Sequence, residues 1–244
     1  MKLITVGTAC GFPKKNRFNS CEFLLVKDNL YVIDAGAPVS DLIPRHDLTY
    51  KQLRAVLITH PHADHIGNLP AFVDLVNGYY KFGEVRFLLP DQTCIDYARF
   101  ITEKLHGGKI DDRLVFQTYT EGVVYEDDLV RFTAIQNGHC ENSYSLLVEA
   151  EGKKVLLSGD LTQDYSDLPA CAFDGSLDFL LLECAHQPVQ AVRETFPRLM
   201  AKQVKLNHLG RLTPEGILTD LLTELSPTLA SPISLAKDGE ETEI

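Results

Sequence analysis

Three histidines and one aspartate fall within a single hexapeptide, H-P-H-A-D-H at positions 60–65, directly after the apolar run 53–59. Apolar residues then recur at helical spacing over 68–79, which predicts that the hexapeptide lies in a loop between a strand and a helix. The chain has eight histidines in total, so a chance cluster of surface histidines is disfavoured. Imidazole and carboxylate groups together suit zinc, iron or manganese better than calcium or magnesium. The hexapeptide therefore predicts a transition-metal site.

Short β-branched and apolar runs alternate with a few helical patterns along the rest of the chain. The expected strands are 3–6, 22–26, 30–34, 53–59, 85–89, 114–117, 129–136, 144–150, 154–158, 178–183, 204–207 and 232–236, the last closing the chain. The expected helices are 68–79, 91–105, 190–202 and 214–224. Strand clusters mixed with helices in two halves predict an α/β (α+β) fold, a four-layer αββα sandwich formed by one domain over 1–244.

Turn and cap residues refine these boundaries. Asp28-Asn29 is expected to form the hairpin turn of an antiparallel meander. Asp91 is a typical N-cap for the helix over 91–105. At the start of the last helix, we expect Thr213 to be the cap and Pro214 to be the first helical residue.

The charge balance restricts the partners that the chain can have. The sequence contains 34 acidic and 23 basic residues, a net charge of −11, which opposes stable, sequence-independent binding to nucleic acid or to an anionic membrane. No apolar run is long enough to span a membrane, and Met1 to Val6 is too short for a signal segment. The six cysteines are far apart and are expected to be buried thiols of a cytoplasmic protein. A homodimer is an alternative to a monomer.

Three further segments follow the hexapeptide in a particular order. They are N-G-H ending at His139, S-G-D ending at Asp160, and N-H-L centred on His208. With D-A-G at 34–36 and A-K-D-G at 236–239, this order resembles the metallo-β-lactamase superfamily over nearly the whole chain. Taken alone, Asp160 could equally be a turn carboxylate and His208 a core histidine, but their joint occurrence in the order of the family favours ligands.

The resemblance implies a site for two divalent metal ions, with zinc as the first expectation and manganese or iron as alternatives. One metal would be held by His60, His62 and His139, and the other by Asp64, His65 and His208. Asp160 would bridge them. A hydroxide shared by the two ions would then be the nucleophile, and Asp64 would contribute to catalysis as well as to binding.

Two features indicate the branch of the superfamily. Lactamases usually have cysteine where this chain has Asp160, so antibiotic hydrolysis is disfavoured. The stretch 7–20, which contains G-T-x-x-x-x-P, resembles the opening loop of ribonuclease Z and of bacterial cyclic-phosphate phosphodiesterases. It implies that Lys15 or Arg17 contacts substrate phosphate. The alternative is an ordinary Gly/Pro turn with a solvated basic tip.

The chain also departs from ribonuclease Z. No histidine lies between Gln187 and Asn207 where an H-x-T motif would stand, and 79–138 is too short and too acidic for an arm that binds transfer RNA. The stretch E-C-A-H-Q-P at 183–188 instead resembles D-C-x-H-P-P of a cyclic-phosphate phosphodiesterase. His186 is therefore a candidate general acid. Alternatively, it holds a ligand in place or packs at the sheet edge.

We therefore expect a phosphodiesterase acting on a small-molecule or short-nucleotide phosphodiester. The alternatives are a lactone or thioester hydrolase on the same fold, a ribonuclease Z-like endonuclease, and a binding module with a vestigial site.

Overall fold

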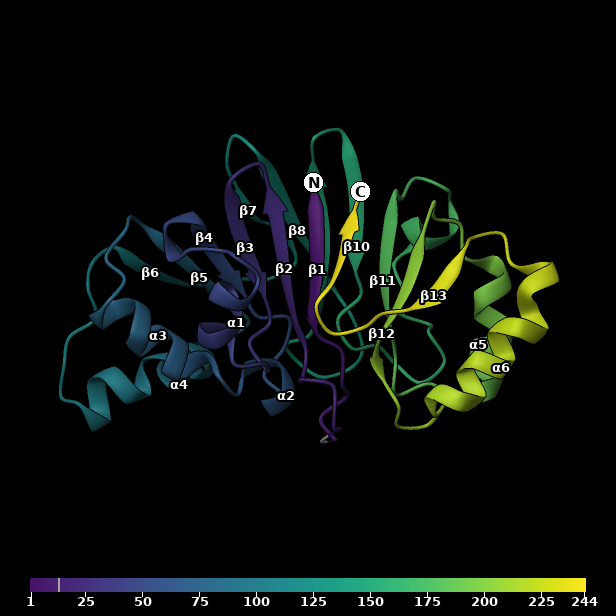
Figure 1. The fold of residues 1–244 in the computed structure, drawn as a ribbon, viewed down its shortest axis with the longest axis horizontal. Helices are drawn as coiled ribbons and strands as arrows, with labels where there is room; N and C mark the ends of the chain where they lie inside the picture. Colours follow the sequence, from purple (N-terminus) through teal and green to yellow (C-terminus); the bar gives the residue numbers. More distant parts are fainter. Residues whose placement is uncertain (13) are drawn as a thin grey trace.

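Two seven-stranded sheets lie face to face in the computed structural model, which describes residues 1–12 and 14–244 (Figure 1). The first sheet has the order β14 (Glu240–Glu243), β1 (Lys2–Gly7), β2 (Cys21–Val26), β3 (Asn29–Ile33), β4 (Leu53–Leu57), β5 (Val85–Leu89) and β6 (Leu114–Thr118). The second has the order β13 (Ile233–Leu235), β12 (Val204–Leu209), β11 (Phe179–Cys184), β10 (Lys153–Leu157), β9 (Tyr144–Ala150), β8 (Val130–Gln136) and β7 (Gly122–Glu126).

Helices cover the outer face of each sheet (Figure 1). The first sheet carries α1 (Val39–Arg45), α3 (Leu69–Gly78) and α4 (Gln92–Phe100), and α4 continues into a π-helical turn, Ile101–Leu105. The second sheet carries α5 (Val189–Thr195) and α6 (Glu215–Leu225). The single-turn helix α2 (Ala63–Ile66) lies at the lower edge of the view in Figure 1. This arrangement confirms the predicted four-layer αββα sandwich.

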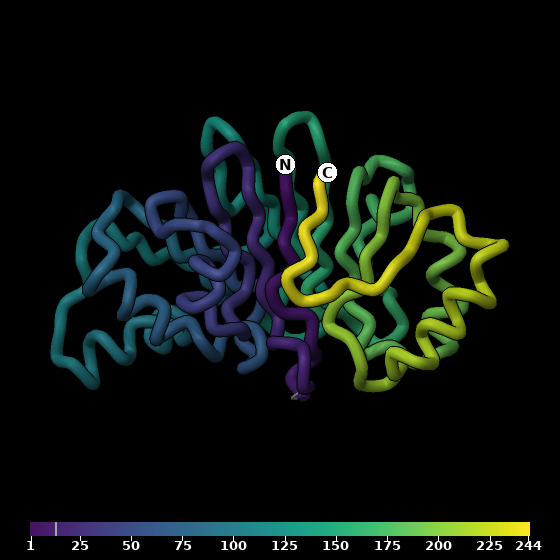
Figure 2. Tube along the Cα trace, viewed as in Figure 1, coloured from purple at the N-terminus to yellow at the C-terminus, as the bar shows by residue number. Residues whose placement is uncertain are grey.

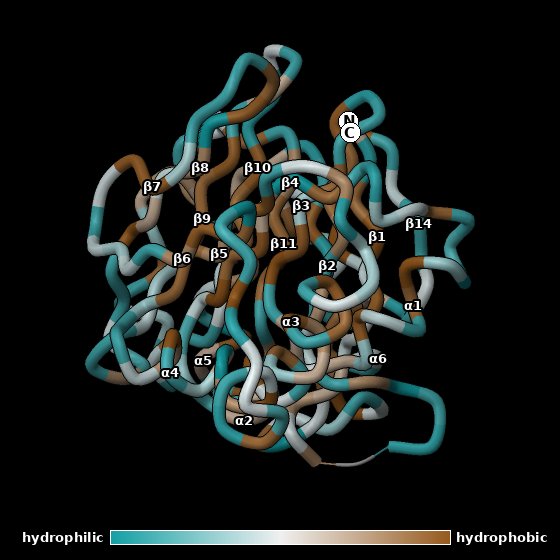
Figure 3. The backbone as a smooth tube through the Cα atoms, turned by 90° about the vertical axis from the view of Figure 1, so that its left-hand side faces the viewer, coloured by the Kyte–Doolittle hydropathy of each residue, from teal (hydrophilic) through white to brown (hydrophobic). Residues whose placement is uncertain are grey.

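Strand alternation explains why the layers form. In β2, Phe23 packs into the apolar cluster beneath the helices, whereas its neighbour Leu24 packs into the cluster between the sheets. Successive side chains of a strand point to opposite faces, so a strand that is apolar on both faces can support two cores. Figure 3 shows the resulting pattern, with hydrophobic residues along the strands and polar residues in many of the connecting loops. Among the described residues, no helix is long and apolar enough to cross a membrane.

The two ends of the chain lie side by side, as Figure 2 shows. β1 and β14 pair antiparallel, with Lys2 opposite Glu243 and Thr5 opposite Glu240. Lys2 also donates a hydrogen bond to Glu241 over 2.8 Å. The last strand therefore completes the first sheet, so the prediction that the strand over 232–236 closes the chain was wrong.

Other boundaries needed correction as well. The predictions omitted α1, β7 and β14, and the helix expected over 190–202 ends at Thr195 before a 3-10 turn, Phe196–Arg198. Asp91 does cap α4, since its carboxylate accepts from the Cys94 amide at 2.8 Å. Thr213 does not cap α6, because its hydroxyl donates to the Gln187 carbonyl while Pro214 occupies the N-cap position.

Candidate metal centre

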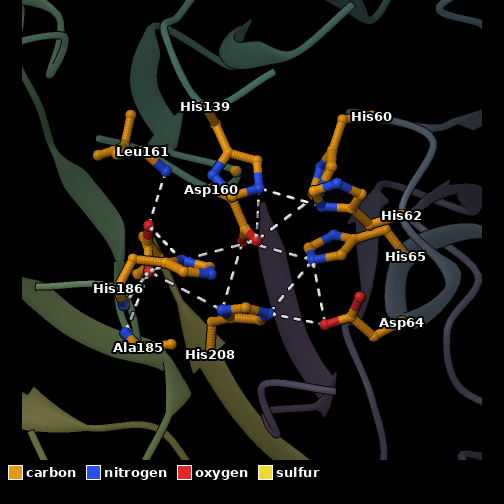
Figure 4. A network of polar contacts seen from close by, with 12 residues as sticks. His60, His62, Asp64, His65, His139, Asp160, Leu161, Ala185, His186 and His208 are labelled. Atoms are coloured by element: carbon orange, nitrogen blue, oxygen red, sulfur yellow. Dashed lines mark hydrogen bonds and ion pairs between the residues drawn. The ribbon is translucent and has the colours of Figure 1, made fainter. Parts of the chain in front are cut away.

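The predicted site residues converge at one end of the sandwich, on the loops that follow the carboxyl ends of the strands (Figure 4). The hexapeptide follows β4, His139 follows β8 and Asp160 follows β10. β3 and β4 run parallel, as do β10, β11 and β12, so within each set the carboxyl ends meet at the same edge. In α/β sheets this edge is where ligands ordinarily bind.

The first group of side chains comprises His60, His62 and His139. Nδ1 of His62 lies 3.1 Å from Nε2 of His60 and 3.1 Å from Nε2 of His139. A neutral imidazole has a single N–H, so three ring nitrogens at this spacing present lone pairs to a common centre. Together with Asp160, their ligand atoms all lie within 4.8 Å of one another.

The second group comprises Asp64, His65 and His208. Nε2 of His208 lies 3.2 Å from Nε2 of His65 and 3.1 Å from Oδ2 of Asp64. These ligand atoms also lie within 4.8 Å of one another. The structure thus brings together two separate sets of three potential ligands, the same sets that the sequence predicts.

Asp160 lies between the two groups, and each of its carboxylate oxygens faces a different one. Oδ1 is 3.3 Å from Nε2 of His65 and 3.4 Å from Nδ1 of His208. Oδ2 is 3.6 Å from Nε2 of His60 and 3.5 Å from Nε2 of His139. A carboxylate placed in this way can bridge two cations.

The donor set fits a metal ion on grounds that the structure itself provides. Nδ1 of His65 lies 2.6 Å from Oδ2 of Asp34, which keeps the proton on Nδ1 and leaves the Nε2 lone pair free for a ligand. A carboxylate behind a histidine in this way is typical of metal sites. Asp160 Oδ1 and His208 Nδ1 are buried and have no hydrogen-bond partner within 1–12 and 14–244. Buried polar atoms are seldom left without a partner.

Burial and charge are unequal across the site. His60, His65, Asp160 and His208 are buried, whereas His62 is exposed and His139 is partly exposed, so the site opens to solvent at these two histidines. Burial and the surrounding imidazoles hold the pKa of His60 well below its usual value, which favours the neutral, ligating form. Burial alone would lower the pKa of His208, but facing carboxylates, Asp160 above all, outweigh it and raise the pKa to about 10.

A β-bulge aims His208 into the site. In the parallel pairing of β11 with β12, Glu183 is opposite Asn207 and Cys184 is opposite Leu209, so His208 is the extra residue. Its φ of 51° lies in the left-handed region. Bulges re-aim side chains next to functional sites, which explains how this strand presents a histidine at its end.

Two glycines permit close approaches around the ligands. Gly159 has a φ of 58°, and a Cβ there would lie 2.8 Å from the Tyr144 carbonyl oxygen. Gly11 has a φ of 65°, and a Cβ there would lie 2.9 Å from Oδ2 of Asp64. The opening loop, residues 8–20, therefore reaches the second group only because position 11 has no side chain. Pro13, part of the predicted motif of this loop, lies outside the described residues.

His186 lies beside both groups, as Figure 4 shows. Its ring centroid is 4.8 Å from that of His139 and 5.4 Å from that of His208. Its Nδ1 is 3.1 Å from each carboxylate oxygen of Glu183 and 3.8 Å from Oδ2 of Asp160. This position is compatible with either predicted role, a general acid or a residue that holds a ligand, so the choice between them stays open.

Glu183 is a residue of the site to which the sequence reasoning assigned no role. It is buried, and its carboxylate accepts from the backbone amides of Leu161 and Ala185 at 2.6 and 3.0 Å. Burial alone would raise the pKa of Glu183, but hydrogen bonds and charge from His186 and His208 outweigh it and hold the pKa well below its usual range. The only sequence signal was an acidic residue that ends an apolar strand.

The two basic residues predicted to contact substrate differ in their surroundings. Arg17 has a side chain that is 14% exposed, donates to the Ala236 carbonyl over 2.9 Å and pairs with Glu215 over 3.0 Å. Lys15 is exposed in the turn between Lys14 and Arg17. Contact of either residue with a substrate stays a prediction.

Comparison with protein families identifies the chain. Residues 1–209 match the model of a family described as anti-Pycsar protein Apyc1. The chain belongs to the Apyc1 family. Within the wider metallo-β-lactamase superfamily, this family falls in the ribonuclease Z-like branch that the sequence predicts.

Individual relatives of this Apyc1-family chain are distant. Ribonuclease Z of Listeria monocytogenes serotype 4a (strain HCC23) is 23% identical over 163 residues, which are 66% of this chain and 53% of that protein. The chain thus spans about half the length of the curated relatives that it matches first.

Solved structures show the same fold. The metallo-β-lactamase fold protein YhfI from Bacillus subtilis has a TM-score of 0.78 and 18% identity, with 100% of this chain and 99% of that chain covered. A diphosphatase from the PhnP family has a TM-score of 0.69 and 18% identity, with 100% and 97% covered. At these identities the likeness establishes the fold alone.

Proposed function

We propose that this Apyc1-family chain is a metal-dependent phosphodiesterase that holds two divalent transition-metal ions, zinc foremost among them. The observation that carries the proposal is Asp160, with one carboxylate oxygen facing each group of three ligands. Paired metal ions, when bound, lower the pKa of a water molecule and stabilise charge on phosphoryl oxygens. The names of the relatives, ribonuclease Z and diphosphatase, describe cleavage at phosphorus and support phosphorus as the electrophile.

The side chains of this site have distinct tasks in such a reaction. His60, His62 and His139 would hold one ion, and Asp64, His65 and His208 the other. Asp34 keeps the proton on Nδ1 of His65 and so fixes the ring for ligation. These contacts position the ligands before any substrate arrives, which is the main contribution of a protein to metal-ion catalysis.

His186 can supply the proton that the leaving group requires. Glu183 faces Nδ1 of His186, so this nitrogen carries a proton and Nε2 is left free of the carboxylate. The negative charge of Glu183 favours the imidazolium form, which can donate from Nε2 to a leaving oxygen. Removal of Glu183 would loosen the ring and weaken its cationic form together.

A substrate panel tests the proposal. Protein purified without chelator should cleave bis(4-nitrophenyl) phosphate at a rate well above its rate on a lactone, a thioester or a lactam. Asp160→Asn should abolish the phosphodiester activity. Asp164→Asn, which changes an exposed carboxylate outside both groups, is the matched control and should retain it. Lactone or thioester turnover without phosphodiester cleavage would replace the proposal by the rival hydrolase.

A further inference from the structure

Two loops form one wall of the candidate site. Leu209 at the end of β12 donates its amide to the Thr8 carbonyl over 2.9 Å, and Ala9 forms a parallel bridge with Leu209. The opening loop therefore runs beside the loop that follows β12, residues 210–213. The loop 210–213 starts two residues after the candidate ligand His208.

The far end of the loop 210–213 is fixed beside His186. The Leu212 amide donates to the Ala185 carbonyl over 2.8 Å, and the Thr213 hydroxyl donates to the Gln187 carbonyl over 2.8 Å. Arg211 is thus held between a candidate ligand on one side and the neighbours of His186 on the other. A residue so anchored at the rim is positioned for substrate recognition rather than left on a floppy segment.

The basic residues at this wall are not equivalent. Lys14 donates to the Leu209 carbonyl and to Glu215, each over 2.9 Å, and Arg17 also pairs with Glu215. One carboxylate therefore engages two cations, which fastens the opening loop to the start of α6. Arg211 is exposed and has no hydrogen-bond or ion-pair partner within the described ranges 1–12 and 14–244.

The surroundings make an unengaged cation at this place informative. The chain carries a net charge of −11, and the site itself contains the carboxylates Asp64, Asp160 and Glu183. An anionic substrate approaching the metal ions would need compensation for these charges at the rim. A guanidinium group matches two phosphate oxygens with two parallel N–H groups, a geometry that lysine lacks.

We propose that Arg211 is the substrate-binding residue of this site and that its guanidinium binds the non-bridging oxygens of the scissile phosphate. The inference deepens the proposed function and rests on it for the identity of the substrate. Arg17 then acts through Glu215 to hold the wall in place. Lys15 stands at the tip of its turn, beyond the anchored part of the wall.

Two measurements on the metal-loaded protein test Arg211. The first is the Kd of inorganic phosphate, and the second is kcat/KM for bis(4-nitrophenyl) phosphate. Arg211→Ala should weaken phosphate binding and lower kcat/KM by about 10- to 100-fold each, the usual worth of a hydrogen bond to a charged group. Arg211→Lys should fall between Arg211→Ala and the unmodified protein. Metal content and thermal midpoint should not change.

Arg45→Ala is the matched control, because Arg45 is an exposed arginine on α1 that also has no ion pair within the described ranges. It should leave both quantities unchanged. Equal phosphate affinity in Arg211→Ala and the unmodified protein would overturn the inference, as would a loss that falls on Lys15→Ala instead. Phosphate binding through Arg211 without any phosphodiester turnover would sink the proposed function but uphold Arg211 as the anion site.

Discussion

Both carboxylate oxygens of Glu183 lie 3.1 Å from Nδ1 of His186, and this pair stands next to the two groups of candidate metal ligands. Glu183 is buried, while the His186 side chain is 16% exposed, so the pair joins the interior of the sandwich to the open face of the site. Such a pair fixes the orientation of the imidazole ring and supports its cationic form.

Removal of His186 should matter most for poor leaving groups. A basic alkoxide requires protonation in the transition state, whereas nitrophenolate requires little. His186→Ala should therefore reduce turnover of an alkyl phosphodiester by ~10²–10⁴-fold, the usual contribution of a general acid. It should reduce turnover of bis(4-nitrophenyl) phosphate far less and leave metal content intact. Steady-state rates for both substrates provide the measurement.

The alternative role of His186 gives a different pattern. If His186 mainly holds a ligand, both substrates should lose activity equally and metal should be lost as well, with effects of ~10–100-fold. That result would contradict the assignment as a general acid.

Asp160 should control the number of bound metal ions. Its two oxygens face different ligand groups, so Asp160→Ala removes a contact from each group and the only side chain shared between them. Metal content should fall from about two ions per chain, the number expected of a paired site, to about one. Elemental analysis of Asp160→Ala beside Asp164→Ala measures this, and unchanged stoichiometry would remove the bridge from the account.

Glu22 should make stability depend on pH. Burial, reinforced by the nearby Asp34 carboxylate, raises the pKa of Glu22 well above its ordinary value. The unfolded chain loses this proton near pH 4.3 while the folded chain keeps it, so stability falls as the pH rises from about 4.3 toward the raised pKa. Glu22→Gln keeps the acceptor for the Asn207 amide and has no proton to lose.

Metal-stripped Glu22→Gln should therefore be more stable than the unmodified protein at pH 7, and the difference should shrink toward pH 4. Urea unfolding across this range gives the free energy of unfolding. Glu121→Gln, at an exposed position, serves as the control and should show no such trend. A variant that is less stable at pH 7 would mean that Glu22 works in its ionised form.

The sequence predicted the sandwich because its strands are strongly apolar and its ligands are concentrated in short motifs. The hexapeptide at 60–65 is a local signal that needs no knowledge of distant contacts. β14 escaped prediction because E-E-T-E at 240–243 has little apolar character, and its pairing with β1 depends on the opposite end of the chain. α1 escaped because it is short and contains Pro44.

Long-range contacts also explain what was missed in the site. Glu183 acts through residues that the fold brings around it, such as the Leu161 amide 22 positions away. Asp34 was part of a predicted turn motif, but its contact with His65 spans 31 positions. The engagement of Arg17 by Glu215 spans 198 positions. Local patterns carry no information on such partners.

The most direct test of the account is a metal titration of phosphodiester turnover. Protein stripped by chelator should not cleave bis(4-nitrophenyl) phosphate, and added zinc or manganese should restore activity that levels off near two equivalents per chain. Cleavage by the stripped protein, or turnover that does not respond to added metal, would contradict the account.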